Sequence, residues 1–197
     1  MAGIGKQAKV ISQDQLRALL AWLKQRRNAE RNRLVVLLSF KAGLRAKEIS
    51  SLKWAMVLNA NGGVGSHIHL TNDASKGESG RIIPLNSELR QLLVHHKSGL
   101  AVRADADGFV ITSERSDSVS AQVIVNLFAD WYERLGFVGC SSHSGRRTFI
   151  TNAARRVSSV GGSLRDVQAL AGHASLQTTA RYIATDNQAQ AKLVNLI

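Results

Sequence analysis

The chain has 197 residues, 44% of them hydrophobic, which is enough for one compact domain and excludes a disordered protein. It carries 26 Lys and Arg against 14 Asp and Glu, a formal net charge of +12, so a polyanionic partner is expected, nucleic acid more than an acidic membrane. The longest apolar run, Leu34 to Leu38, is far too short to span a bilayer, the start of the chain lacks a secretory signal, and the single cysteine, Cys140, excludes an internal disulfide.

The first predicted elements are helices. Ser12 and Gln15 form the pattern of a capping box, so a helix is expected to begin there. A second helix, over residues 31–42, is apolar nearly all round and is expected at the centre of the core. Gly43 is typical of the left-handed residue that ends a helix, and a short helix is expected over residues 45–54.

A small β-hairpin is predicted next. The run Asn61-Gly62-Gly63 is a turn signal, and two short strand patterns follow, over residues 66–70 and 80–85, joined by a polar stretch. Residues 108–112 fit a third strand.

Helical patterns return in the second half of the chain. Ser163 and Asp166 predict a helix that ends near Gly172, and Ser175 predicts the start of the next helix. An apolar stripe over residues 189–197 predicts a terminal helix that needs a groove, on this chain or on a neighbour. The expected fold class is therefore one domain, mainly α, with a small antiparallel β-hairpin.

Several polar segments carry side chains that suit transesterification at a phosphodiester. The reaction needs an in-line nucleophile, cations for the non-bridging oxygens and a proton for the departing oxygen. Arginine neutralises phosphate without a metal, because its planar fork donates bidentate hydrogen bonds. Arg45 is expected at a helix start, with Glu48 on the same face to hold its guanidinium. Lys76 follows on the hairpin loop, within reach of DNA.

Two more segments lie towards the C-terminus. His143 and Arg146 are spaced i,i+3, so both are expected to point at one phosphate from the first turn of a helix. His173 is expected in a turn after Gly172, and Tyr182 on the helix that follows. Each of these residues taken alone is more typical of a helix end or a core; their order and spacing indicate a site.

These segments resemble the catalytic domain of the tyrosine recombinase, or phage integrase, family. The matching residues are 42–49, 75–85, 143–151 and 170–182. The resemblance implies the tyrosine recombinase catalytic-domain fold, found in DNA breaking-rejoining enzymes. Gly145 departs from the family pattern, which usually has leucine there, and predicts looser local packing.

The resemblance also implies the residues that move protons and bonds. Tyr182 would be the nucleophile that forms a 3′-phosphotyrosyl bond and releases a 5′-hydroxyl. Lys76 would be the general acid for the leaving 5′-oxygen, and His143 would assist proton transfer.

The remaining site residues would hold the phosphate. The resemblance implies that Arg45 and Arg146 clamp it, that His173 hydrogen-bonds it, and that Glu48 supports the site from behind. The sequence has no phosphate-binding glycine loop and no cluster of metal-ligating residues, so neither a cofactor nor a metal is expected.

Other basic residues fit DNA contacts. A dense run before and within the second helix suits either a solvated face or phosphate contacts, and two arginines lie close to the site segments. The expected DNA-binding residues are Lys24, Arg26, Arg27, Arg31, Arg33, Arg147 and Arg181. Tyr132, within an apolar helix, is expected in the core.

The expected domain organisation is a single catalytic domain over residues 1–197, with the family's N-terminal core-binding domain absent. The chain would then be either a natural single-domain recombinase or a fragment of a larger integrase. The expected partners are double-stranded DNA and further copies in a synaptic tetramer, assembled through the terminal helix. The expected location is the cytoplasm of a bacterium, on the nucleoid, with the gene either bacterial or carried by a phage.

Two other functions remain open at this point. A type IB topoisomerase-like enzyme shares the chemistry but relaxes DNA as a single protomer, without exchanging strands. A non-catalytic DNA-binding regulator on the same fold would not cleave DNA at all.

Overall fold

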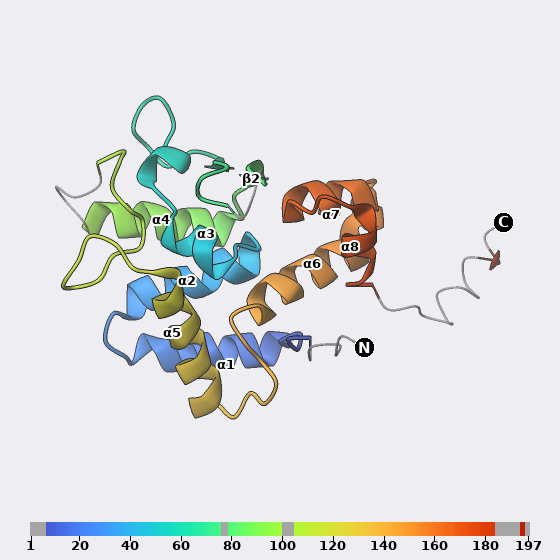
Figure 1. Ribbon diagram of the computed structural model, residues 1–197, viewed down its shortest axis with the longest axis horizontal. Coiled ribbons are helices and arrows are strands. Elements are labelled where there is room, and N and C mark those ends of the chain that lie inside the picture. Colours follow the sequence, from blue (N-terminus) through green and yellow to red (C-terminus); the bar gives the residue numbers. More distant parts are fainter. Residues whose placement is uncertain (1–6, 76–78, 100–104, 184–193, 196–197) are drawn as a thin grey trace.

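The computed structural model describes residues 7–75, 79–99, 105–183 and 194–195 (Figure 1). In these ranges helices dominate and one two-stranded antiparallel sheet accompanies them, so the predicted fold class is confirmed. In chain order the elements are α1 (Gln13–Lys24), α2 (Ala29–Lys41), α3 (Ala46–Ser50), the 3₁₀ helix η1 (Trp54–Met56), β1 (His67–Leu70), β2 (Arg81–Pro84), α4 (Ser87–Gly99), α5 (Ala121–Arg134), α6 (Ser144–Arg156), the 3₁₀ helix η2 (Val157–Val160), α7 (Leu164–Ala171) and α8 (Leu176–Ala180).

The first two helices form an antiparallel pair, with α2 crossing the middle of the main body and α1 below it (Figure 1). The predicted capping box begins α1, because the Ser12 hydroxyl accepts from the Gln15 backbone and the Gln15 side chain accepts from the Ser12 backbone. Most of α2 is buried, as its uniform apolar pattern predicts, and helices α1, α3, α4 and α6 pack against it.

The hairpin has the predicted strands but lacks the predicted third one. Ile68 on β1 lies opposite Ile83 on β2, and both are buried. Residues 108–112 make only an isolated bridge, between Phe109 and Lys53, so the prediction of a strand there is wrong. The same bridge holds the chain extended at Lys53, and the helix predicted over 45–54 is accordingly split into α3 and η1.

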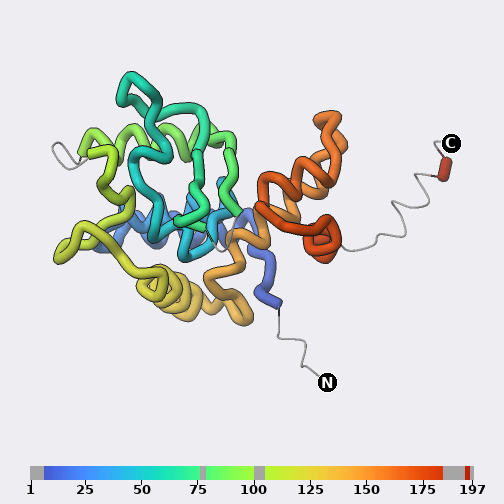
Figure 2. The backbone as a smooth tube through the Cα atoms, turned by 45° about the horizontal axis from the view of Figure 1, so that its top comes forward, coloured from blue at the N-terminus to red at the C-terminus, as the bar shows by residue number. Residues whose placement is uncertain are grey.

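Helix α6 joins the main body to a C-terminal lobe, residues 157–183, which contains η2, α7 and α8. Figures 1 and 2 show the first turns of α6 against the main body and its second half covered by the lobe. The lobe has its own small core, in which Ile150 of α6 packs with Val167 and Ala171 of α7. Any pocket between lobe and main body is therefore framed by α6.

The prediction of looser packing at Gly145 is wrong. Gly145 is buried on the face of α6 that meets α2. A Cβ added there would lie 2.3 Å from Ser39 Oγ and 2.8 Å from the Phe40 ring. The missing side chain lets the two helices approach more closely, and Phe40 fills the space.

The predicted terminal helix lies outside the described residues except for Val194 and Asn195. Within the described part of the chain, no helix has both the length and the apolar character needed to cross a membrane.

Candidate active site

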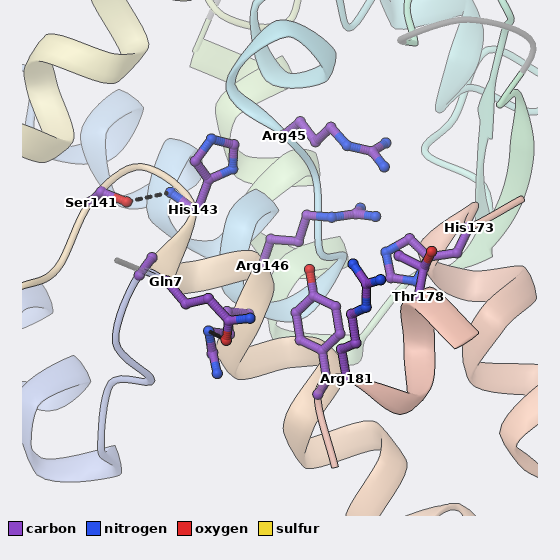
Figure 3. Close-up of a pocket in the computed structure, with 11 residues that line it drawn as sticks. Gln7, Arg45, Ser141, His143, Arg146, His173, Thr178 and Arg181 are labelled. Atoms are coloured by element: carbon purple, nitrogen blue, oxygen red, sulfur yellow. Dashed lines mark hydrogen bonds between the residues drawn. The ribbon is translucent and has the colours of Figure 1, made fainter. Parts of the chain in front are cut away.

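A pocket of about 510 Å³ lies where the C-terminal lobe meets the main body. Its lining includes Arg45, His143, Arg146, His173 and Tyr182, which come from α3, α6 and the lobe. Figure 3 shows Arg45 and Arg146 extending alongside each other, with their guanidinium groups towards His173. The structure thus brings together five of the predicted site residues, while Lys76 lies outside the described residues.

Arg45 is the N-cap of α3, as the sequence predicts. Its Nη1 lies 2.6 Å from Glu48 Oε1, and its backbone N–H donates to Glu48 Oε2 at 2.8 Å. Glu48 is fully buried. Burial alone would raise the pKa of Glu48, but hydrogen bonds and charge from Arg81 and Arg45 outweigh it, so the pKa lies below its usual value. The carboxylate is therefore ionised and fixes the Arg45 side chain.

Arg146 lies deeper, with 4% of the residue exposed. Its Nη1 donates to the Gly43 carbonyl at 2.7 Å and its Nη2 to the Ala171 carbonyl at 2.5 Å. Burial, followed by repulsion from Arg45, lowers the pKa of Arg146 to about 9, which leaves it cationic at neutral pH. A guanidinium has five N–H donors, so Arg146 keeps capacity for an anion after these two bonds.

His173 lies in the turn after α7, where Gly172 takes the left-handed conformation. Its Nδ1 is 2.9 Å from the hydroxyl of Thr179, and its ring stacks on Tyr182 with centroids 5.5 Å apart. Burial, then the nearby cations Arg146, Arg45 and Arg81, lower the pKa of His173 to about 4. The imidazole is neutral at physiological pH and keeps its Nε2 for a ligand.

The prediction that Tyr182 lies on the helix is wrong, because α8 ends at Ala180 and Tyr182 lies in the turn just beyond it. Its backbone N–H still donates to the Thr179 carbonyl, and its ring is half-buried beneath the guanidinium of Arg147, whose Cζ is 5.8 Å from the ring centroid. Tyr132, by contrast, is buried in the main core, as predicted.

His143 and the segment before α1 form the outer wall of the pocket. His143 is the N-cap of α6 and is exposed, and its backbone N–H donates to Ser141 Oγ at 3.3 Å (Figure 3). Gln7 accepts a hydrogen bond from Arg147. Arg147 and Arg181 both line the pocket, so two of the predicted DNA-binding residues lie at the site.

The other predicted DNA-binding residues are not near this pocket. They lie around the connection from α1 to α2, at the opposite end of the molecule from α8 (Figure 1). Arg27 pairs with Glu114, and Arg33 with Glu88 at 3.1 Å. This group comprises Lys24, Arg26, Arg27, Arg31 and Arg33.

Arg81 was not among the site residues predicted from the sequence. Its side chain is 6% exposed, and its two terminal nitrogens lie 3.0 and 3.1 Å from the oxygens of Glu48. The strand pattern could have indicated it. Residues two apart on a strand share a face, so Arg81 lies on the same inward face as the buried Ile83.

The side chains in and around the pocket carry more positive than negative charge. Arg45, Arg81 and Arg146 surround one carboxylate, Glu48, so the cluster has a net excess of cations in a partly buried place. Among the described residues, no group of three or more His, Cys, Asp and Glu side chains is placed to hold a metal ion. The arrangement suits an anion with several oxygens, held by guanidinium groups.

Comparison with known proteins agrees with this geometry. The phage integrase family matches residues 9–189 of the chain. The chain belongs to this family. Among curated members of the family, tyrosine recombinase XerA of Pyrococcus furiosus is 30% identical over 155 residues, covering 77% of this chain and 49% of that protein. Tyrosine recombinase XerD of Ralstonia nicotianae is 31% identical over 157 residues, covering 77% of this chain and 47% of its own length.

Solved structures of recombinases share the fold. A crystal structure of XerA recombinase superposes with a TM-score of 0.73 at 23% identity, covering 95% of this chain and 64% of that one. The structure of XerH site-specific recombinase bound to its difH substrate superposes with a TM-score of 0.71 at 19% identity, covering 98% of this chain and 55% of that one. The resemblance to the recombinase catalytic domain is therefore confirmed, and the chain spans about half the length of the curated relatives it matches.

Proposed function

We propose that this chain is a site-specific DNA recombinase that cleaves and rejoins strands through a 3′-phosphotyrosyl intermediate on Tyr182. The observation that carries the proposal is the convergence of Arg45, Arg146, His173 and Tyr182 on one pocket with excess positive charge. Relatives in the family are named tyrosine recombinases, which supports strand exchange over the alternatives.

The proposed reaction exchanges one phosphodiester for another. The Tyr182 oxygen attacks phosphorus in line, the bond from phosphorus to the 5′-oxygen breaks, and the 3′-phosphate stays on the tyrosine. Lys76 gives a proton to the 5′-oxygen, and His143 assists by taking the phenol proton. Because the ester energy is retained, attack by a second 5′-hydroxyl reverses the step and needs neither ATP nor a metal.

The other site residues stabilise the charge that develops on the phosphate. Arg45 and Arg146 donate to the non-bridging oxygens, and Glu48 keeps Arg45 in place. His173, neutral and bonded through Nδ1, donates from Nε2. Removing one donor of this kind costs about 3–4 kcal/mol of barrier, so a site with several accounts for a large rate effect.

The wider assembly is also part of the proposal. Residues 1–197 would act as one catalytic domain on double-stranded DNA, with Arg147 and Arg181 on phosphates beside the cleaved one. Four copies would pair two sites in a synaptic tetramer, through the C-terminal segment, on DNA in the cytoplasm. A topoisomerase-like enzyme would instead act as one protomer, so protein stoichiometry on paired sites separates the two functions.

Covalent trapping tests the chemistry. We expect the chain to form a denaturation-resistant adduct with nicked duplexes drawn from the DNA that flanks its gene, because a nick lets the 5′-hydroxyl fragment escape. Tyr182→Phe should abolish the adduct. Tyr132→Phe is the matched control, since its hydroxyl is buried without a hydrogen-bond partner among the described residues and should be dispensable.

Each outcome assigns the function differently. An adduct with Tyr182→Phe at the wild-type level would show that the nucleophile is wrongly assigned. A wild-type protein that binds these duplexes but traps no adduct would instead support the non-catalytic regulator.

A further inference from the structure

Arg81 joins the two parts of the molecule that form the pocket. Its terminal nitrogens bond the Glu48 carboxylate of α3, and its Nε donates to the Leu170 carbonyl of α7 at 2.8 Å. The buried guanidinium of Arg81, which comes from the hairpin, therefore bonds both the main body and the C-terminal lobe.

The contact on α7 lies at the end of the helix, where the last carbonyls have no partner within the helix and carry partial negative charge. Arg81 donates a hydrogen bond to the Leu170 carbonyl, and Arg146 donates one to the carbonyl of the next residue, Ala171. The turn that carries His173 follows immediately. It packs on the Arg81 side chain so closely that a Cβ on Gly172 would come within 2.9 Å of Arg81 Cδ.

The contact on Glu48 controls Arg45 in turn. Glu48 is fully buried, and the same carboxylate oxygen, Oε1, accepts from both Arg45 and Arg81. Without Arg81, a buried carboxylate would keep Arg45 as its single cationic partner and would draw that guanidinium inward, away from a phosphate.

We propose that Arg81 is a positioning residue for strand cleavage. It fixes the position of Arg45 relative to the turn that carries His173, through its bonds to Glu48 and Leu170. The inference rests on the proposed function. It assigns to Arg81 no contact with the phosphate: its terminal nitrogens bond Glu48, and its effect passes through the two groups that do make contact.

A neutral phosphate analogue separates this role from that of a structural brace. In a methylphosphonate, a methyl group replaces one non-bridging oxygen, so the scissile centre carries no charge and needs the arginine clamp less. Substituting a residue that positions the arginine clamp should therefore slow cleavage less on methylphosphonate DNA than on phosphate DNA. Substituting a residue that only stabilises the fold should slow cleavage by the same factor on both substrates.

The experiment compares release of the 5′-hydroxyl strand from saturating nicked DNA, with either a phosphate or a racemic methylphosphonate at the scissile position. We expect Arg81→Gln to slow release about 100-fold on phosphate, as for loss of a preorganised donor, and less than about tenfold on methylphosphonate. Arg45→Ala should show the same pattern. Arg90→Gln is the control for loss of an arginine that bonds the backbone, because Arg90 donates to the carbonyls of Gly65 and Val64, whereas Arg81 bonds Glu48 and Leu170.

Arg81→Lys keeps the charge and guards against a variant that fails to fold. A lysine lacks the fork that reaches Glu48 and Leu170 together, so we expect Arg81→Lys to unfold cooperatively and still lose at least about tenfold in cleavage. Wild-type cleavage by either variant, or an equal loss on both substrates, would overturn the positioning role. If the wild-type protein itself released no strand, the proposed function would fail instead.

Discussion

Thr179 is a second residue whose importance appears only in the folded protein. It is fully buried, and its hydroxyl lies 2.9 Å from His173 Nδ1. A neutral imidazole has one donor nitrogen and one acceptor nitrogen, and the partner of one nitrogen selects the role of the other. A hydroxyl that donates to Nδ1 leaves the proton on Nε2, where it can reach a phosphate oxygen.

Replacing Thr179 tests this assignment. Thr179→Val keeps the shape and removes the hydroxyl, so we expect cleavage to slow about tenfold, equivalent to roughly 1.4 kcal/mol of barrier. Thr179→Ser retains the hydroxyl and should retain most of the rate. The measurement is single-turnover strand release from nicked DNA. A valine variant as fast as wild type would mean that the tautomer is set by another group.

His173 also predicts a pH dependence of stability. Its pKa is about 4 in the folded protein, against an ordinary value of 6.5, so between these values the unfolded chain binds a proton that the folded chain does not. Stability therefore rises with pH through this window and is lost as pH falls from about 6.5 towards 4. We expect the free energy of unfolding, measured with urea, to fall less between about pH 7.5 and pH 5 for His173→Asn than for wild type. Equal losses would show that His173 does not titrate in this way.

At the scale of elements, the packing of α6 on α2 depends on Gly145. An alanine Cβ would lie 2.3 Å from Ser39 Oγ, so the helices must separate, and overpacking of this kind costs about 1–3 kcal/mol. We expect Gly145→Ala to lower the midpoint of thermal unfolding and Ser39→Ala to restore part of the loss. Gly99→Ala is the control, because a Cβ there meets nothing within 4 Å. Equal midpoints for Gly145→Ala and Gly99→Ala would show that the contact can relax without cost.

The elements that the sequence predicts well are those specified by near neighbours. The caps at Ser12 and Ser163 depend on a partner three residues away, and both form as expected. The third strand fails for the opposite reason, since residues 108–112 would pair with a segment far away in the sequence and form one bridge there. Arg81 was missed likewise, because its partners Glu48 and Leu170 lie on other elements.

At the scale of the whole molecule, the basic residues fall into two groups with different surroundings. At the pocket, Arg45 and Arg81 share the carboxylate of Glu48, Arg146 bonds backbone carbonyls, and Arg181 is exposed. At the connection from α1 to α2, Arg27 already has an acidic partner in Glu114. A net charge of +12 therefore does not indicate by itself which of the two groups would bind a polyanion.

The salt dependence of DNA binding distinguishes the two groups. Each phosphate contact contributes about 0.9 to the slope of log affinity against log salt concentration on duplex DNA. We expect Arg181→Gln, in a Tyr182→Phe background that binds without cleaving, to lower the slope by about that amount. Arg27→Gln should leave the slope unchanged, because Glu114 already compensates its charge. Both substitutions remove one positive charge, so a difference between them isolates contact from net charge. An equal fall for Arg27→Gln would place the duplex across the connection between α1 and α2, and would support the phosphate contacts that the sequence predicts there.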